Sequence, residues 1–230
     1  ILWQAKPHVG TDRLRDAVKG LREEIIKAGG EVRFSHAVRD ILTGRGALRG
    51  LLADTPEGSI EIEADRAIFA VGHSARDTMA MLYEHGLAME QKPFAVGVRI
   101  EHPRAMIDRS QYGGVAGHPA LGAAEYKLSV RPRDGRGVYT FCMCPGGEVI
   151  AAASEEGGLV VNGMSEFARD AENSNSALLV GVGPGDFGGG AYAADHPLAG
   201  IDFQRRMERA AFALGGGGYR APIQLTGDFL

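Results

Sequence analysis

One short segment combines residue types that could do acid–base chemistry: Lys6-Pro7-His8. Pro7 stiffens the backbone, and Thr11 or Asp12, a few residues later, is a residue type that caps the N-terminus of a helix. A lysine and a histidine at a helix N-terminus could hold an anionic substrate or move a proton. They could equally lie on a solvent-exposed loop, because most loop residues carry no function. We predict Lys6 and His8 as the candidate catalytic residues.

A pair of cysteines offers a second kind of chemistry. Cys142 and Cys144 flank Met143, so on a strand both sulfur atoms would face the same side. Redox dithiols usually have two intervening residues, and neighbours on a strand are poorly placed for a disulfide. No second cluster of His or Cys supplies further metal ligands. The spacing therefore favours structural cysteines in the core, and we predict no metal site.

An apolar segment that ends in glycine suggests a ligand site. Ala67–Val71 reads as a strand that runs into Gly72, and Ser74 follows two residues later. A glycine at a strand end lets a ligand approach the main chain closely. In open α/β sheets, ligands bind beyond the carboxyl ends of strands. Gly72 could instead simply turn the chain.

The first part of the sequence must fold into elements that position these residues. Apolar residues at helical spacing predict a helix from about Thr11 to Ala28, which Gly29-Gly30 ends. After Ser74 a second helix is predicted over Ala75–His85. The strands predicted between these helices, ahead of Ala67–Val71, are Glu31–Phe34 and a β-meander of Ala37–Leu42, Ala47–Ala53 and Ser59–Glu63.

Beyond Lys92-Pro93 the pattern indicates antiparallel strands. Pro145-Gly146-Gly147 predicts a tight hairpin. A short helix fits Pro103–Gln111, and a longer one fits Pro197–Leu214. The strands predicted in this part are Phe94–Glu101, Glu125–Arg131, Gly137–Cys144, Glu148–Ser154 and Leu159–Asn162.

Composition excludes several classes of protein. The formal net charge is −4 over 230 residues, which argues against a nucleic-acid binder. No apolar run approaches the length of a membrane span. Two cysteines fit a reduced intracellular protein rather than a disulfide scaffold. We therefore expect a cytoplasmic protein that binds neither nucleic acid nor membrane.

Several phrases together resemble one bacterial family, the FAD-dependent dehydrogenases described as NAD(FAD)-utilising. The segment Ala67–Ser74 is also similar to the second flavin-contacting motif of glutathione-reductase-type flavoproteins. The phrases that carry the family resemblance span most of the chain: Lys6–Asp12, Val71–Asp77, Lys92–Pro103, Gly137–Gly147, Ser154–Gly158 and Asn162–Ser165.

The resemblance implies where FAD would lie. It implies that Val38 offers its backbone to the adenine, although Val38 could also be an ordinary core valine, and both can hold together. It also implies that the lead-in Lys6-Pro7-His8 passes near the substrate side of the isoalloxazine. The residues whose main chain it places against the cofactor are Ala70, Val71, Gly72, His73 and Ser74.

The resemblance implies a mixed α/β (α+β) fold in two parts. Residues 1–91 would form a partial FAD-binding, Rossmann-like domain with the β-meander. Residues 92–230 would form a mostly antiparallel, inserted or substrate-type domain with helices. No strand–Gly-x-Gly-x-x-Gly–helix unit, which would hold the FAD pyrophosphate, occurs in the sequence. We therefore expect an internal piece that is inactive alone and retains no FAD.

For the parent protein the resemblance implies an FAD-dependent oxidoreductase with an unidentified small-molecule substrate. NAD(P)H as a further cofactor and a homo-oligomeric assembly stay open. The expected partners are the missing N- and C-terminal parts of the same chain. The alternative function is that of a non-catalytic substrate lid or oligomerisation module in a larger flavoprotein.

Overall fold

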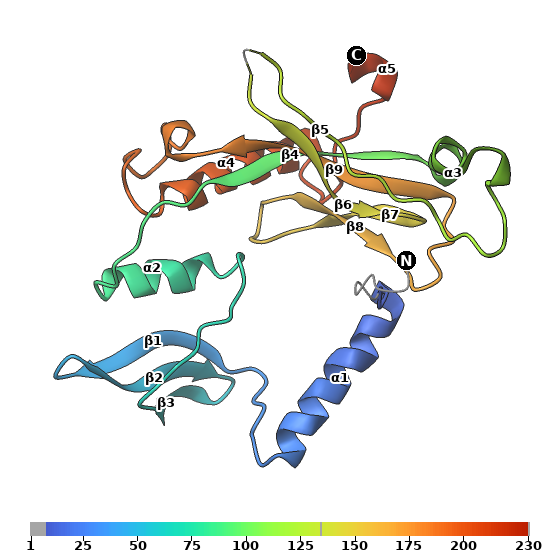
Figure 1. Cartoon of the computed structure of the whole chain (residues 1–230). Coiled ribbons are helices and arrows are strands. Elements are labelled where there is room, and N and C mark those ends of the chain that lie inside the picture. Colours follow the sequence, from blue (N-terminus) through green and yellow to red (C-terminus); the bar gives the residue numbers. More distant parts are fainter. Residues whose placement is uncertain (1–7, 134, 230) are drawn as a thin grey trace.

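The computed structural model describes residues 8–133 and 135–229. Helix α1 (Thr11–Lys27), a three-stranded sheet and helix α2 (Arg76–Glu84) form the lower part of Figure 1. The strands from β4 onward and helix α4 form the upper part. Among the described residues, no helix has the length and apolar character needed to cross a membrane.

Helix α1 confirms the prediction for its segment. Its apolar residues recur every three or four positions along one face, and Gly29, with φ of +87°, follows its end. That apolar face is unpacked, because the helix has no buried residue. Leu14 is 52 % exposed and Leu21 is 68 % exposed. A stripe of this kind normally faces a core, but no described residue buries this face of α1.

The predicted β-meander is also confirmed. It comprises β1 (Ala37–Gly44), β2 (Ala47–Thr55) and β3 (Gly58–Glu63), antiparallel with β2 in the centre. Ile41 and Ala53 are its buried hydrophobic residues. Helix α2 packs against β1, and the His85 side chain that follows α2 donates a hydrogen bond to Asp40.

The strands predicted over Glu31–Phe34 and Ala67–Val71 are wrong. Neither segment pairs with another described strand. A strand exists through the hydrogen bonds it makes to a neighbour, and an apolar sequence cannot supply that neighbour. Ile68, in the middle of the second segment, is 96 % exposed.

The upper part is built on a four-stranded antiparallel sheet with the order β4-β9-β6-β5. Strand β4 (Phe94–Pro103) pairs along its whole length with β9 (Asn173–Val182). The other strands of this part are β5 (Ser129–Val130), β6 (Val138–Cys144), and the separate hairpin of β7 (Gly147–Ala152) and β8 (Val160–Ser165). The strand predicted over Glu125–Arg131 is therefore reduced to β5.

The predicted hairpin at Pro145-Gly146-Gly147 is wrong. A tight turn is present, but β6 pairs with β9 while β7 pairs with β8. Gly146 has φ of +51°, and a Cβ atom there would overlap the backbone of Arg169. The chain before β9 thus packs onto this turn, and β9 takes the place beside β6 that the prediction gave to β7.

Aromatic packing holds the sheet against helix α4 (Ala199–Leu214). Phe187 is 1 % exposed and forms one core cluster with Val182 and Ala199. Its ring centroid lies 5.2 Å from that of Phe94 and 5.9 Å from that of Phe203. The remaining elements are α3 (Arg104–Tyr112), α5 (Thr226–Phe229) and two short 3-10 turns, Gly113–Val115 and Pro184–Asp186. Antiparallel sheets combined with helices confirm the predicted α+β class.

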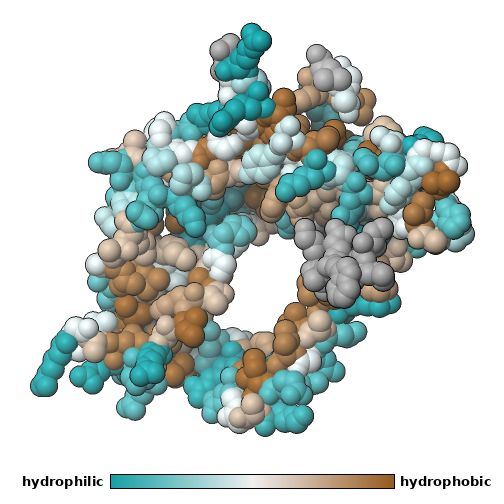
Figure 2. Space-filling model, viewed as in Figure 1, coloured by the Kyte–Doolittle hydropathy of each residue, from teal (hydrophilic) through white to brown (hydrophobic). Residues whose placement is uncertain are grey.

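The lower and upper parts enclose an opening that Figure 2 shows in space-filling view. Apolar side chains, brown in Figure 2, lie along the side of the opening that α1 forms. The predicted boundary between two domains near Glu90–Lys92 stays a prediction.

Replacing Phe187 with Ala is expected to lower the free energy of unfolding by about 3–5 kcal/mol, because it leaves a cavity among packed rings. The matched control, Phe34→Ala, removes a ring that is 66 % exposed and should change that free energy by less than ~0.5 kcal/mol. Urea unfolding followed by circular dichroism measures both. Equal losses in the two variants would show that Phe187 is not in the core.

Candidate functional site

The first candidate site is the glycine turn, Ala70–Ser74, which lies between β3 and α2. All of its residues are exposed. Gly72 has φ of +74°, and a Cβ atom built on it would meet no atom within 4 Å. No N–H group of the turn donates a hydrogen bond to another described residue. The turn therefore offers accessible main-chain donors beside a glycine, which suits close approach by a ligand.

Val38, the other residue implied to contact the cofactor, lies in β1 and is half-buried. It pairs with Ala53 of β2, and the register of the two strands shifts between Val38 and Asp40. The side chain of Val38 is partly buried, and the backbone pairing beside it is irregular. Val38 can therefore still be a core valine, a backbone contact to the adenine, or both.

His8 lies against the connection between β8 and β9. Its Nε2 atom donates a hydrogen bond to the carbonyl oxygen of Glu166 over 2.8 Å, since a carbonyl can only accept. In the neutral ring this leaves Nδ1 as a proton acceptor. Lys6, the other predicted catalytic residue, lies outside the described residues.

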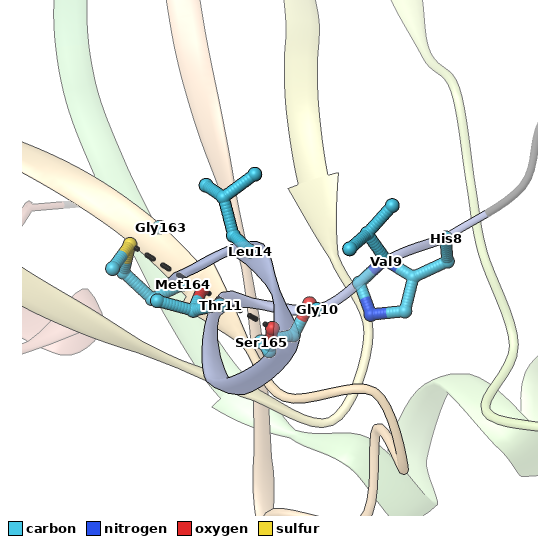
Figure 3. A pocket seen from close by; sticks show the side chains of 8 residues that line it. All are labelled: His8, Val9, Gly10, Thr11, Leu14, Gly163, Met164 and Ser165. Atoms are coloured by element: carbon cyan, nitrogen blue, oxygen red, sulfur yellow. Dashed lines mark hydrogen bonds between the residues drawn. The ribbon is translucent and has the colours of Figure 1, made fainter. Parts of the chain in front are cut away.

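A cavity of about 230 Å³ separates the start of α1 from β8. Thr11 Oγ1 donates to the carbonyl oxygen of Ser165 over 3.3 Å and contacts Met164 Sδ at 3.7 Å (Figure 3). The residues that line the cavity are His8, Val9, Gly10, Thr11, Leu14, Gly163, Met164 and Ser165.

Glycine is required where α1 meets the β8–β9 connection. Gly10 has φ of +80°, and a Cβ atom there would overlap the backbone of Phe167. The N–H of Phe167 donates to Asp12 Oδ1 over 2.8 Å, and the Arg13 guanidinium stacks 3.4 Å from the Phe167 ring centroid. The carboxylate of Asp12 already occupies the positive end of the helix, so α1 gives little added attraction for an anionic substrate.

A larger cavity, of about 520 Å³, lies on another side of His8. Its size is within the range of small-molecule sites. The Arg169 guanidinium there donates to Glu125 over 2.7 Å. The residues that line it are His8, Gly122, Ala123, Phe167, Ala168 and Arg169. His8 thus borders both cavities, and neither cavity includes a residue of the glycine turn.

An ion-pair network anchors the glycine turn to the upper part of the molecule. Arg76, the first residue of α2, has a side chain only 1 % exposed. It donates to both carboxylate oxygens of Glu208, over 3.1 and 2.6 Å. It also donates to Glu155 over 3.0 Å and to Gln204 over 3.3 Å. The buried cation is therefore paired and hydrogen-bonded, as a buried charge must be.

Glu155 connects this network to a second cation. Arg205 Nε and Nη2 reach its two carboxylate oxygens over 2.7 and 2.6 Å. These hydrogen bonds from Arg205, with a smaller contribution from Arg76, hold the pKa of Glu155 at about 2, against the partial burial that raises it. The sequence did not predict this network, because its members lie far apart in the chain; the one signal was that Arg76 and Glu155 lie in segments that carry the family resemblance.

The two cysteines occupy different environments. Cys144 is buried, at 7 % exposure, as predicted for a core cysteine. Cys142 is exposed, so the prediction of a buried structural residue is wrong there. Among the described residues, no group of three or more His, Cys, Asp or Glu side chains could hold a metal ion.

Comparison with known proteins identifies the family. Residues 93–230 match the family described as FAD-dependent protein, C-terminal domain-like. This chain belongs to that family. An uncharacterized protein of Clostridium beijerinckii is 50 % identical over 231 residues, covering 100 % of this chain and 42 % of that relative. The chain thus spans less than half the length of that relative. The family match confirms the expectation of an FAD-dependent family.

The low pKa of Glu155 predicts a pH dependence of stability. The folded pKa of Glu155, about 2, lies below the ordinary value of 4.5. The contribution of this carboxylate to the free energy of unfolding is therefore present above pH 4.5 and is lost as the pH falls toward 2. At about 1.4 kcal/mol per pKa unit, the upper limit for this loss of unfolding free energy is ~3 kcal/mol. Because its side chain is 29 % exposed, solvent screening reduces the expected loss to about 1–2 kcal/mol.

Urea unfolding at a series of pH values tests this. Glu155→Gln should flatten the fall of the unfolding free energy between pH 4.5 and 2. The neighbouring exposed Glu156 supplies the control, and Glu156→Gln should keep the wild-type profile. Identical profiles for wild type and Glu155→Gln would contradict the network.

Proposed function

We propose that this chain is part of an FAD-dependent oxidoreductase of the dehydrogenase type, with the flavin nucleotide against Ala70–Ser74. Family membership supports the cofactor, and the accessible main chain around Gly72 supports the place. The latter is the observation that carries the proposal. When bound, FAD supplies the acceptance or release of an electron pair.

The residues of the turn fit such a cofactor in two respects. Their main-chain N–H groups donate to no other described residue and so can donate to its polar groups, and the absence of a side chain at Gly72 lets the cofactor approach the backbone. Arg76 fixes the start of α2 two residues after Ser74. The turn is thereby held before ligand binds, which reduces the entropy lost on binding. Val38 would contribute its backbone to the adenine.

The proposed catalytic residues are Lys6 and His8, acting on an unidentified small-molecule substrate. Support comes from His8: its Nε2 atom donates to the carbonyl oxygen of Glu166, and its Nδ1 atom, which makes no hydrogen bond to another described residue, can act as an acceptor. The adjoining cavity of about 520 Å³ can receive a small ligand. NAD(P)H as electron donor is part of the same proposal.

The proposed partner of α1 is further polypeptide of the same protein. Val18 and Ile25 of the helix are 56 % and 50 % exposed, in line with Leu14 and Leu21. Contiguous apolar surface of this kind marks an interaction site. The relative of C. beijerinckii has more than half of its length outside the region of similarity, which supplies chain to cover the stripe.

A non-catalytic role as a substrate lid or oligomerisation module is the second candidate. The same exposed stripe on α1 favours it, because a second copy of the chain could cover this surface. In that case the glycine turn would contact no flavin. The two proposed functions therefore differ in whether Gly72 contacts a flavin.

The test is the flavin content of the intact flavoprotein that carries this chain. Gly72→Val places a β-branched residue at φ of +74° and should weaken FAD binding at least ~10-fold, a loss of about 1.4 kcal/mol. Absorbance of the flavin released on denaturation measures it. We expect the 230-residue chain alone to purify colourless, since the pyrophosphate-binding glycine turn is missing from it.

Gly117 provides the matched control. It has φ of +85° and open space around it, so Gly117→Val imposes similar backbone strain away from the proposed site. That variant should retain FAD. If Gly72→Val kept the wild-type FAD content, contact between FAD and the glycine turn would be refuted. If the wild-type protein held no flavin, the non-catalytic role would be the one supported.

A further inference from the structure

The strand that carries both cysteines is interrupted by a β-bulge. Phe141 pairs with Ala177 and Cys144 pairs with Asn175, so Cys142 and Met143 face a single residue of β9. Cys142 has φ of +47°, a left-handed conformation that residues other than glycine seldom adopt. Bulges re-aim side chains and are frequent beside active sites.

The bulge removes the argument that these cysteines are ordinary strand neighbours. The Cys144 thiol donates to the carbonyl oxygen of Cys142 over 3.4 Å, so its sulfur atom lies close to the backbone of the other cysteine. Burial first, and then interaction with the Cys142 thiol, raise the pKa of Cys144. The Cys144 sulfur atom is therefore in direct contact with the main chain of Cys142, and the bulge brings the two cysteines together.

The two thiols differ in access to solvent. Cys142 is exposed, whereas Cys144 is 7 % exposed. Arg99 Nη1 donates to the carbonyl oxygen of Cys142 over 3.1 Å and lies 3.9 Å from Cys144 Sγ. The Arg99 guanidinium offsets only part of the rise in the pKa of Cys144, because a cation beside a sulfur atom stabilises its thiolate. A reagent in solution can reach Cys142, and Cys144 is held behind it beside a cation.

We propose that Cys142 and Cys144 form a reversible redox pair that reacts with small-molecule disulfides. The Cys142 thiolate attacks one sulfur of the disulfide, forming a mixed disulfide and releasing one thiolate. The Cys144 thiolate then attacks the Cys142 sulfur, closing an internal disulfide and releasing the second thiolate. Two protein thiols are oxidised, one disulfide is reduced to two thiols, and the protons pass to the released thiolates.

This pair is independent of the flavin and goes beyond the proposed function. A purely structural role explains a buried Cys144, but it explains neither an exposed thiol at Cys142 nor its left-handed backbone. Strained backbone of this kind persists where the surrounding structure enforces it, and it clusters at functional sites.

Glutathione disulfide tests the proposal on the 230-residue chain. The reduced chain is incubated with it, quenched with acid and analysed by intact mass. We expect the loss of two hydrogen atoms, no bound glutathione and no free thiol on alkylation after unfolding. Closure should be at least ~10-fold faster in the folded chain than in urea, because the fold holds the thiols together.

Single variants assign the roles. Cys144→Ser should stop at one glutathione on Cys142, and Cys142→Ser should react slowly until the chain is unfolded. If either variant fails to fold, the intact mass of the wild-type chain after reaction with glutathione disulfide still shows whether the internal disulfide forms. A stable glutathione adduct on wild-type Cys142, disulfide-linked dimers, or equal closure rates in buffer and in urea would overturn the proposal.

Discussion

The arrangement of this molecule depends on the hydrogen-bonded ion pairs of one buried guanidinium group. Arg76 carries its charge into the interior, where an unpaired ion would cost several kcal/mol. Glu208 and Gln204 of α4, together with Glu155 from the connection between β7 and β8, accept hydrogen bonds from its two terminal nitrogens. Since Arg76 begins α2, this pairing fixes the glycine turn and α2 relative to the upper sheet. An arginine suits the position because its planar head binds a carboxylate through two hydrogen bonds.

A second junction completes the enclosure seen in Figure 2. At the start of α1, Gly10 permits contact with Phe167, and His8 and Asp12 bind the same connection between β8 and β9. The lower part is thus attached at two places, while the apolar face of α1 between them stays uncovered. This uncovered face is the physical basis of the proposal that further polypeptide covers α1, because exposed apolar surface costs free energy that burial would recover.

The parts of the fold that the sequence predicted are those set by local pattern. Helical spacing and the glycines at its end define α1, and turn residues separate the strands of the meander. Strand β9 was not predicted, because Ser174, Asn175 and Ser176 are polar and give no alternating apolar pattern, yet all three are fully buried. Their burial is possible because the strand pairs on both sides. The prediction of a strand over Ala67–Val71 was wrong for the opposite reason, since this segment has the sequence of a strand but no partner strand among the described residues.

For the candidate site, the sequence supplied residues but not their arrangement, and their roles stay predictions. The sequence singled out His8 and the glycine turn, but it could not show that they lie apart, nor that Gly10 seats His8 between two cavities. Arg76 and its partners are separated by 79 and 132 residues, and no local pattern predicts such pairing. The bulge at Cys142 was equally hidden, because it arises from register against β9.

Amide hydrogen exchange of Arg76→Gln tests the central claim, that this network holds α2 to the upper part. Loss of a buried partner costs about 3 kcal/mol, so protection of α2 should fall about 100-fold, while β4 and β9 keep theirs. Arg33, in an exposed pair with Glu31, gives the control Arg33→Gln, which should leave every element unchanged. Unaltered protection of α2 in Arg76→Gln, or equal loss in β4 and β9, would contradict the account.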